Sequence, residues 1–108
     1  SVRQYIDQHY KESITLDLLA EKFSINKYYM AHAFKREYGV SPINYLIDCR
    51  IREGKRLLTE TDFSLSQIAA VLGFSSSSYF SQRFRSAEGI SPTEYRSANR
   101  AVFRHELR

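Results

Sequence analysis

Apolar residues recur at three- and four-residue spacing along most of the chain, which is the period of an amphipathic helix. Two short stretches of this kind begin directly after Thr15 and Ser64, whose side-chain oxygens can accept hydrogen bonds from the first free amides of a helix. Their apolar positions correspond one to one: Leu16, Leu19, Ala20 and Phe23 in the first stretch, and Leu65, Ile68, Ala69 and Leu72 in the second. The pattern therefore predicts two short helices of the same kind.

A brief turn and a longer helical pattern follow each short helix. The turns span residues 24–26 and 73–76, where turn-forming residues accompany one apolar residue. The buried faces predicted for the longer helices are Met30, Ala33, Phe34 and Tyr38 in the first, and Phe80, Phe84 and Ala87 in the second. Gly39 and Gly89 are expected to end these helices as C-terminal caps. The sequence thus predicts two helix-turn-helix units, at about residues 15–38 and 64–88.

The two units are copies of one pattern. The run Gly-Val-Ser-Pro-Ile-Asn-Tyr at residues 39–45 recurs fifty positions later as Gly-Ile-Ser-Pro-Thr-Glu-Tyr, whereas Leu16 and Leu65 are only 49 positions apart. One residue was therefore inserted in the turn of the second copy. Two copies are too few for a solenoid, so we expect a duplicated motif within a single domain covering residues 1–108.

A third apolar stripe joins the two copies over residues 43–58 and predicts one continuous connector helix. Its members are Ile43, Leu46, Ile47, Ile51, Gly54, Leu57 and Leu58. Sixteen residues at a rise of 1.5 Å span roughly 24 Å, a length suited to holding two recognition helices about one duplex turn, roughly 34 Å, apart. With a C-terminal helix and tail at residues 92–108, the expected fold is all-α, with about seven helices.

Basic side chains are also present on the connector and in the tail. We expect Arg50, Arg52, Lys55 and Arg56 to form a solvated face balanced by neighbouring acids, with packing of Arg50 as an alternative. We expect the basic tail to be a frayed, solvated end, with phosphate contact as the alternative; it consists of Arg100, Arg104, His105 and Arg108.

The solvent-facing side of each longer helix carries no carboxylate. Its positions are Lys27, Tyr28, Ala31, His32 and Lys35 in the first copy, and Ser77, Ser78, Ser81, Gln82 and Arg85 in the second. Aspartate and glutamate are absent from residues 26–36 and 75–87, as a surface that meets phosphates requires. Hydroxyl, amide and imidazole groups suit base edges, and the small Ala31 suits a thymine methyl. We expect the DNA backbone to be contacted by Lys27, Lys35, Arg36 and Arg85. For any one of these residues, the alternative is an ordinary solvated helix face.

Composition narrows the class of function. The formal charge of +4 and the isoelectric point near 9.3 suit a polyanionic partner. The single cysteine, Cys49, excludes an internal disulfide and a multi-cysteine zinc site, and we expect it to be a buried thiol in a reducing cytoplasm. We expect no metal, no cofactor and no membrane contact. The chain begins with serine, and we expect it to be a segment of a longer protein.

Two other classes of function compete with DNA binding. An enzyme is disfavoured because the sequence lacks several motifs typical of enzymes. It contains no glycine-rich phosphate loop, no Gly-x-Ser-x-Gly elbow and no metal-spaced pair among His9, His32 and His105. A protein-binding helical adaptor is the better rival, because Tyr28, Tyr29 and Tyr79 could anchor a partner protein. Salt dependence distinguishes protein binding from DNA binding, because only binding to a DNA duplex should weaken steeply as the salt concentration rises.

The double unit, its connector and its repeated Gly-x-Ser-Pro breaks resemble the DNA-binding domain of the AraC/XylS family. The most specific part is residues 68–96, with Ile-Ala-Ala-Val-Leu-Gly-Phe, then Ser-Tyr-Phe-Ser-Gln-Arg-Phe-Arg, then Gly-Ile-Ser-Pro-Thr-Glu-Tyr-Arg. The chain departs from the family pattern at Gly54, where alanine is usual, and at Ser76, where an acidic cap is common.

This resemblance implies a cytoplasmic bacterial transcription regulator, usually an activator, that binds double-stranded DNA. Its implied partners are RNA polymerase and a separate N-terminal domain that binds an effector or dimerises. It places base reading on the same helix faces as the pattern does, at Tyr28, Ala31, His32, Ser77, Ser78, Ser81 and Gln82.

Overall fold

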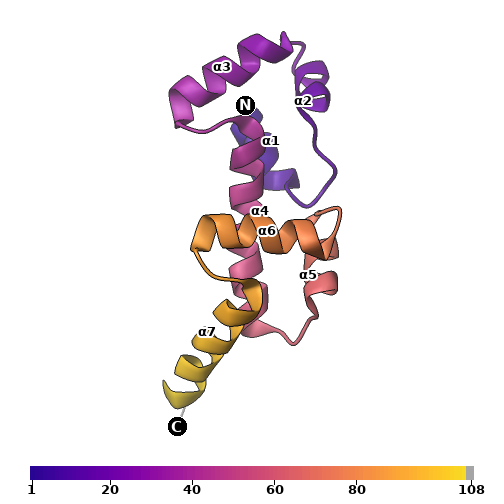
Figure 1. The fold of residues 1–108 in the computed structure, drawn as a ribbon. Helices are drawn as coiled ribbons and strands as arrows, with labels where there is room; N and C mark the ends of the chain where they lie inside the picture. The colour runs from indigo at the N-terminus through magenta and orange to yellow at the C-terminus, as the bar shows by residue number, and fades with distance from the viewer. Residues whose placement is uncertain (107–108) are drawn as a thin grey trace. The chain divides into compact units, whose positions relative to one another are not determined.

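A computed structural model describes residues 1–106 of the chain, and within that range it contains seven helices and no strand (Figure 1). The expectation of an all-α fold with two helix-turn-helix units is confirmed. Side chains are described as far as Arg100, so Arg108 and the side chains of Arg104 and His105 lie outside the described residues. The helices are α1 Val2–His9, α2 Leu16–Lys22, α3 Lys27–Tyr38, α4 Pro42–Glu60, α5 Leu65–Leu72, α6 Ser77–Glu88 and α7 Pro92–Glu106.

The helices form two compact units, the first comprising residues 1–49 and the second beginning at Arg50. In the first unit α2 packs against α3. Its core takes residues from α1, the loop before α2, α2, α3 and the first half of α4, and Cys49 is buried in it as expected. The buried members are Ile6, Ile14, Leu19, Met30, Phe34, Leu46 and Cys49.

In the second unit, α6 packs against both α5 and α7. Gly54 faces this core from α4, and a Cβ atom on it would lie 3.2 Å from both Leu72 Cδ1 and Phe80 Cε1. Glycine therefore lets these side chains approach the α4 backbone closely, and α4 continues through it without a break. The buried apolar members are Ile51, Leu57, Leu58, Ile68, Ala69, Leu72, Phe74, Phe80 and Phe84.

The Arg50 side chain is packed in the protein rather than solvated, as the alternative prediction had it. Its side chain is buried, and its guanidinium carbon lies 5.4 Å from the centroid of the Phe74 ring. Burial lowers the pKa of Arg50 from its ordinary value. Arg52 and Arg56 are exposed as expected, and Arg56 donates hydrogen bonds to Glu53 at 2.7 Å and to Glu60 at 2.9 Å. Lys55 is half-buried instead, and its Nζ lies 3.0 Å from Glu88 Oε1 on α6.

The repeated Gly-x-Ser-Pro run ends one helix and begins the next. Gly39 and Gly89 adopt left-handed conformations, with φ of 82° and 83°, at the ends of α3 and α6. The hydroxyl oxygen of Ser41 accepts a hydrogen bond from the Asn44 amide at 3.2 Å, and Ser91 does the same for Glu94 at 3.1 Å. The following proline is the first residue of α4 or α7, a position where its missing N–H costs nothing.

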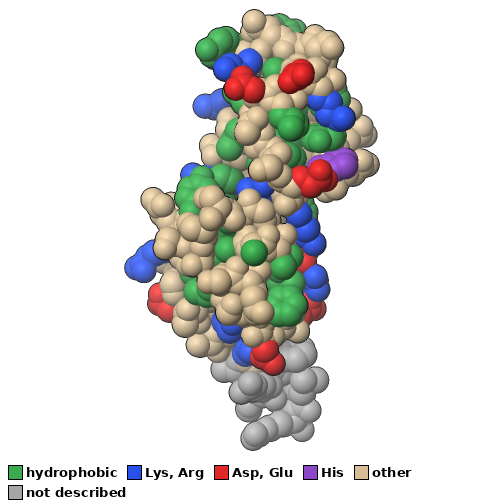
Figure 2. Space-filling view, turned by 90° about the vertical axis from the view of Figure 1, so that its right-hand side faces the viewer, with side chains coloured by type: hydrophobic (Ala, Val, Ile, Leu, Met, Phe, Trp, Pro, Cys, Tyr) green, Lys and Arg blue, Asp and Glu red, His purple; other side chains and the backbone are tan. Residues whose placement is uncertain are grey.

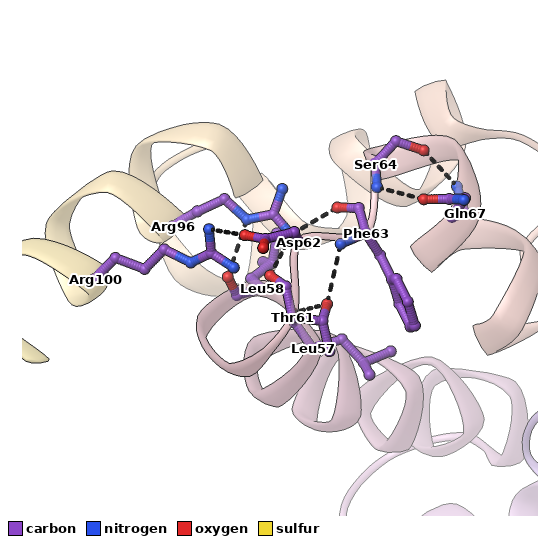
Figure 3. A network of polar contacts seen from close by, with 9 residues as sticks. All are labelled: Leu57, Leu58, Thr61, Asp62, Phe63, Ser64, Gln67, Arg96 and Arg100. Atoms are coloured by element: carbon purple, nitrogen blue, oxygen red, sulfur yellow. Dashed lines mark hydrogen bonds and ion pairs between the residues drawn. The ribbon is translucent and has the colours of Figure 1, made fainter.

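Arg96 fastens α7 to the end of α4 (Figure 3). Its Nε donates to the carbonyl oxygen of Leu58 at 2.9 Å, and its Nη2 donates to the carbonyls of Phe63 at 2.7 Å and Thr61 at 3.4 Å. One guanidinium thus satisfies carbonyls that the end of α4 and the loop leave without helical partners. This fixes the loop that leads into the capping box of α5.

Two expectations about individual residues were wrong. Ala87 is exposed, not buried, because the buried face of α6 consists of Phe80 and Phe84 and position 87 lies beside that face, as the exposed Glu37 does in the first copy. Arg100 is not a frayed end, since α7 continues past it and its Nη1 lies 2.8 Å from Asp62 Oδ1.

Candidate nucleic-acid interface

The turn between the two helices of each unit has the same backbone path. Ser24 and Gly73 both have positive φ, at 53° and 92°. The next amide in each copy donates to a carbonyl of the preceding helix, from Ile25 to Ala20 at 3.0 Å and from Phe74 to Ala69 at 2.9 Å. These equivalent positions are 49 residues apart, so the turns begin in the same register.

The longer helices begin at side-chain caps fifty positions apart. The Asn26 side-chain oxygen accepts hydrogen bonds from the amides of Tyr28 and Tyr29, both at 3.0 Å. The Ser76 hydroxyl accepts one from the Tyr79 amide at 3.0 Å. The change from a separation of 49 to one of 50 falls between Phe74 and Ser76, which identifies Ser75 as the inserted residue and confirms the predicted insertion.

The two recognition helices, α3 and α6, match in length and in burial. Each contains 12 residues. Every position from 26 to 42 has the same class of burial as its counterpart from 76 to 92. The repeated sequence therefore gives a repeated surface, and a residue exposed on one helix has an exposed partner at the same place on the other.

All eleven predicted contact residues lie on these two helices. The exposed ridge of α3 carries Tyr28, His32 and Lys35, and 68% of the Tyr28 surface is exposed. The same ridge of α6 carries Ser78, Gln82 and Arg85. Arg36 is exposed beside the first ridge, and the half-buried residues along the ridge edges are Lys27, Ala31, Ser77 and Ser81.

The absence of acids is a property of these two faces and not of the whole surface, since Glu37 and Glu88 lie only at the C-terminal ends of α3 and α6. On the face drawn in Figure 2, acidic and basic side chains both occur over each unit, with hydrophobic side chains between them. In contrast, residues 26–36 and 75–87, which contain most of α3 and α6, have no aspartate or glutamate. The two faces can therefore approach a polyanion without repulsion from their own residues.

One acid from a neighbouring helix reaches this surface, and the sequence pattern did not reveal it. Asp17 Oδ1, on α2, lies 2.9 Å from Lys27 Nζ at the start of α3. The hydrogen bond with Asp17, and then its charge, raise the pKa of Lys27 above its ordinary value. Nothing in a separation of ten residues across a turn signals this contact. Tyr29, which the helix projection did not place on this face, is 66% exposed, close to the 68% of Tyr28.

Other kinds of site receive no support in the described part of the chain. No group of three histidine, cysteine or acidic side chains there is arranged to hold a metal ion. Among the described helices, none has the length and apolar character needed to cross a bilayer.

Comparison with known proteins also identifies helix-turn-helix units in this chain. A family model described as a helix-turn-helix domain matches residues 19–98. The chain is 39% identical over 92 residues to YdiP of Escherichia coli (strain K12), an uncharacterized HTH-type transcriptional regulator, covering 85% of this chain and 30% of that protein. The chain thus spans about a third of the length of the curated relatives it matches.

Solved structures match as well. The C-terminal domain of AraT, a response regulator from Geobacillus stearothermophilus, matches with a TM-score of 0.86 and 34% identity over 90% of this chain and 81% of that one. The DNA-binding domain of AdpA, a global transcriptional factor solved in complex with a target DNA, matches with a TM-score of 0.87 and 30% identity over 94% of this chain and 91% of that one. The chain therefore belongs to the AraC/XylS-type helix-turn-helix family and is a DNA-binding domain of a transcriptional regulator.

Proposed function

We propose that the domain binds double-stranded DNA sequence-specifically by inserting α3 and α6 into successive major grooves. The observation that carries this proposal is the pair of matched, exposed, acid-free ridges, each on the second helix of a helix-turn-helix unit. In such units the second helix lies in the major groove while the first braces it across the backbone. Two units in one chain then read two adjacent half-sites without a second subunit.

The two ridges are proposed to read different bases, because their side chains differ. Gln82 has the donor and acceptor needed to pair with an adenine edge. His32 and the serines of α6 offer single hydrogen bonds, and Ala31 offers contact with a thymine methyl. Tyr28, Ser77, Ser78 and Ser81 complete the proposed base-reading set, and Lys27, Lys35, Arg36 and Arg85 are proposed to bind phosphates.

We further propose that DNA binding activates transcription in a bacterial cytoplasm, through contact with RNA polymerase. Membership in the AraC/XylS family supports this, since its members are usually activators. Because the chain spans about a third of its relatives' length, we also propose that an N-terminal domain for effector binding or dimerisation accompanies it. A promoter carrying the selected site upstream tests activation, which requires more transcript with the regulator than without it.

Selection of bound duplexes from a random pool, followed by footprinting, tests the DNA-binding mode. We expect an asymmetric site whose protected positions cover two successive major-groove faces. Recovery of duplexes with no common sequence would contradict sequence-specific binding, and protection of a single groove would contradict the use of both helices.

Substitutions then separate base reading from phosphate contact. His32→Ala and Gln82→Ala should each relax the preference at a different base position, by about 1–3 kcal/mol. Lys35→Ala should weaken binding to all sequences alike. These effects are measured as dissociation constants for single-base variants of the selected duplex. Uniform losses from the first two variants would remove their base-reading assignment.

The exposure of Tyr28, Tyr29 and Tyr79 favours a second candidate function, the binding of another protein. Aromatic side chains are common anchors at protein interfaces. Salt dependence distinguishes the two functions. Duplex binding should weaken with a slope of about 0.9 in log K per phosphate neutralised, whereas an aromatic interface should be nearly insensitive to salt.

A further inference from the structure

One cation of the proposed DNA-binding surface already has an anionic partner within the protein. Lys27 Nζ lies 2.9 Å from Asp17 Oδ1. The same ammonium lies 5.3 Å from the centroid of the Tyr28 ring, which keeps it at the start of α3. Among the four cations assigned to phosphate, Lys27 alone forms an ion pair with a side chain in the part of the protein described to that detail.

We propose that Asp17 competes with DNA phosphates for Lys27 and so restrains the affinity of the first unit for any duplex. This inference rests on the proposed DNA-binding function and adds an internal competitor to it. A lysine held by a carboxylate must exchange that partner for a phosphate before it neutralises backbone charge. Because phosphate contacts carry no sequence information, the restraint acts on all duplexes alike.

The pair is exposed enough for such an exchange. The Asp17 side chain is 80% exposed and that of Lys27 is 35% exposed. Exposed ion pairs are weak, because water screens the attraction and holding two side chains together costs entropy. Asp17 therefore lowers the contribution of Lys27 to DNA binding without abolishing it.

In the part of the second unit whose side chains are described, no ion pair of this kind stands at the start of α6. The position equivalent to Asp17 is Ser66, at the separation of 49 that holds up to the turn. The position equivalent to Lys27 is Ser77, at the separation of 50 that holds after it. Neither serine is charged, so α6 begins without a cation and without a competitor. The restraint is specific to the first unit, even though the backbone of the two units is repeated.

Salt-dependent binding of four variants tests the competition. A labelled random-sequence duplex of about 30 base pairs, titrated with protein between 50 and 200 mM salt, reports both affinity and salt slope. The variants are Asp17→Asn, Lys27→Met, the double variant, and Glu21→Gln as a matched control. Glu21 is an exposed acid on the same helix and is not the partner of Lys27.

We expect Asp17→Asn to tighten binding about two- to fivefold at 100 mM salt, which is the range that exposed ion pairs allow. The salt slope should steepen by up to about 0.9, the value for one more phosphate neutralised. Adding Lys27→Met should remove both changes. Glu21→Gln should give a smaller gain, from long-range charge alone, with no change in slope.

Three results would overturn the inference. An unchanged slope in Asp17→Asn would show that Lys27 is not released to phosphate. A gain that persists in the double variant, or an equal gain from Glu21→Gln, would show that the charge of Asp17 acts without Lys27. If the wild-type domain bound no duplex at all, the proposed DNA-binding function would fail. The three results above, in contrast, leave that function intact and overturn only the competition between Asp17 and phosphate. Thermal unfolding of each variant confirms that the domain remains folded.

Discussion

The two helix-turn-helix units share a backbone but pack the residue in the turn differently. In the second unit Phe74 is 6% exposed and lies beneath the Arg50 guanidinium, with the rings of Tyr79 and Phe80 beside it. Its equivalent in the first unit, Ile25, is 37% exposed and lines a cavity of about 160 Å³. Repeated caps and hydrogen bonds are therefore enough to reproduce the turn, while the packing beneath it is free to diverge.

The recognition surfaces diverge in the same way. The ridge of α3 presents a phenol, an imidazole and an ammonium, whereas the ridge of α6 presents a hydroxyl, an amide and a guanidinium. One aromatic contact is the same in both units. Phe34 meets Tyr45 edge-on, and Phe84 meets Tyr95 in the same way, with ring centroids 5.7 and 5.4 Å apart. The duplication thus kept the support for each of these helices and changed the exposed surface that we propose reads DNA.

The largest expected effect comes from truncating the residue in the turn. Phe74→Ala should cost about 3–5 kcal/mol, because it empties a buried aromatic site. Ile25→Ala should cost about 1 kcal/mol or less, because much of that side chain is already in water. Urea unfolding of both variants measures the difference. Equal costs would mean that the two turns are packed alike in solution.

The next largest effect comes from Arg96, which acts only in the second unit. Arg96→Met should cost about 1.5–3 kcal/mol, because it leaves carbonyls at the end of α4 without their charged donor. Arg100→Met is the matched control on the same helix and should cost at most about 1 kcal/mol, since its partner Asp62 is exposed. A loss for Arg96→Met no larger than that of the control would contradict the role of the guanidinium.

A smaller and equal effect is expected at the two glycine caps. Gly39→Ala and Gly89→Ala should each cost about 1–2 kcal/mol, because both glycines have positive φ. A Cβ atom at either position would meet no other atom within 4 Å, so the cost is conformational and should be the same in both units. Unfolding free energies that differ clearly between the two variants would show that the helix ends are not equivalent.

The smallest effect is a pH dependence confined to the start of α7. Hydrogen bonds with Ser91 lower the pKa of Glu94 below its ordinary value of 4.5, whereas the equivalent residue before α4 is Asn44, which does not titrate. Because the folded pKa is the lower one, this contribution stabilises the fold above pH 4.5 and is lost as the pH falls through the folded value.

The measurement is the stability difference between wild type and Glu94→Gln from pH 7 to pH 3. The difference should shrink as the pH falls below 4.5. A difference that stays constant over that range would assign the stabilisation to something other than the carboxylate.

The sequence predicted those parts of the fold that depend on local rules. Thr15, Ser64, Gly39 and Gly89 each cap a helix through their own backbone or side chain, so the bounds of the two units followed directly from their positions. Helix α1 was not located, because it is short and Ile6 is its only fully buried residue. Its place in the core depends on contacts made far along the chain.

The candidate site was predicted to a similar extent. The exposed ridges followed from helical periodicity, which is local. The pairing of Asp17 with Lys27, the network around Arg96 and the burial of Arg50 did not, because each depends on how separate segments pack in three dimensions.

Missing-base interference on the selected site tests most directly whether α3 and α6 contact one duplex in successive major grooves. For the wild-type domain, we expect two patches of sensitive bases about 10 base pairs apart, centre to centre. His32→Ala should remove the sensitivity of one base position in one patch, and Gln82→Ala that of one base position in the other. A single patch in the wild type would contradict contact in two successive major grooves. So would a loss of sensitivity in the same patch in both variants.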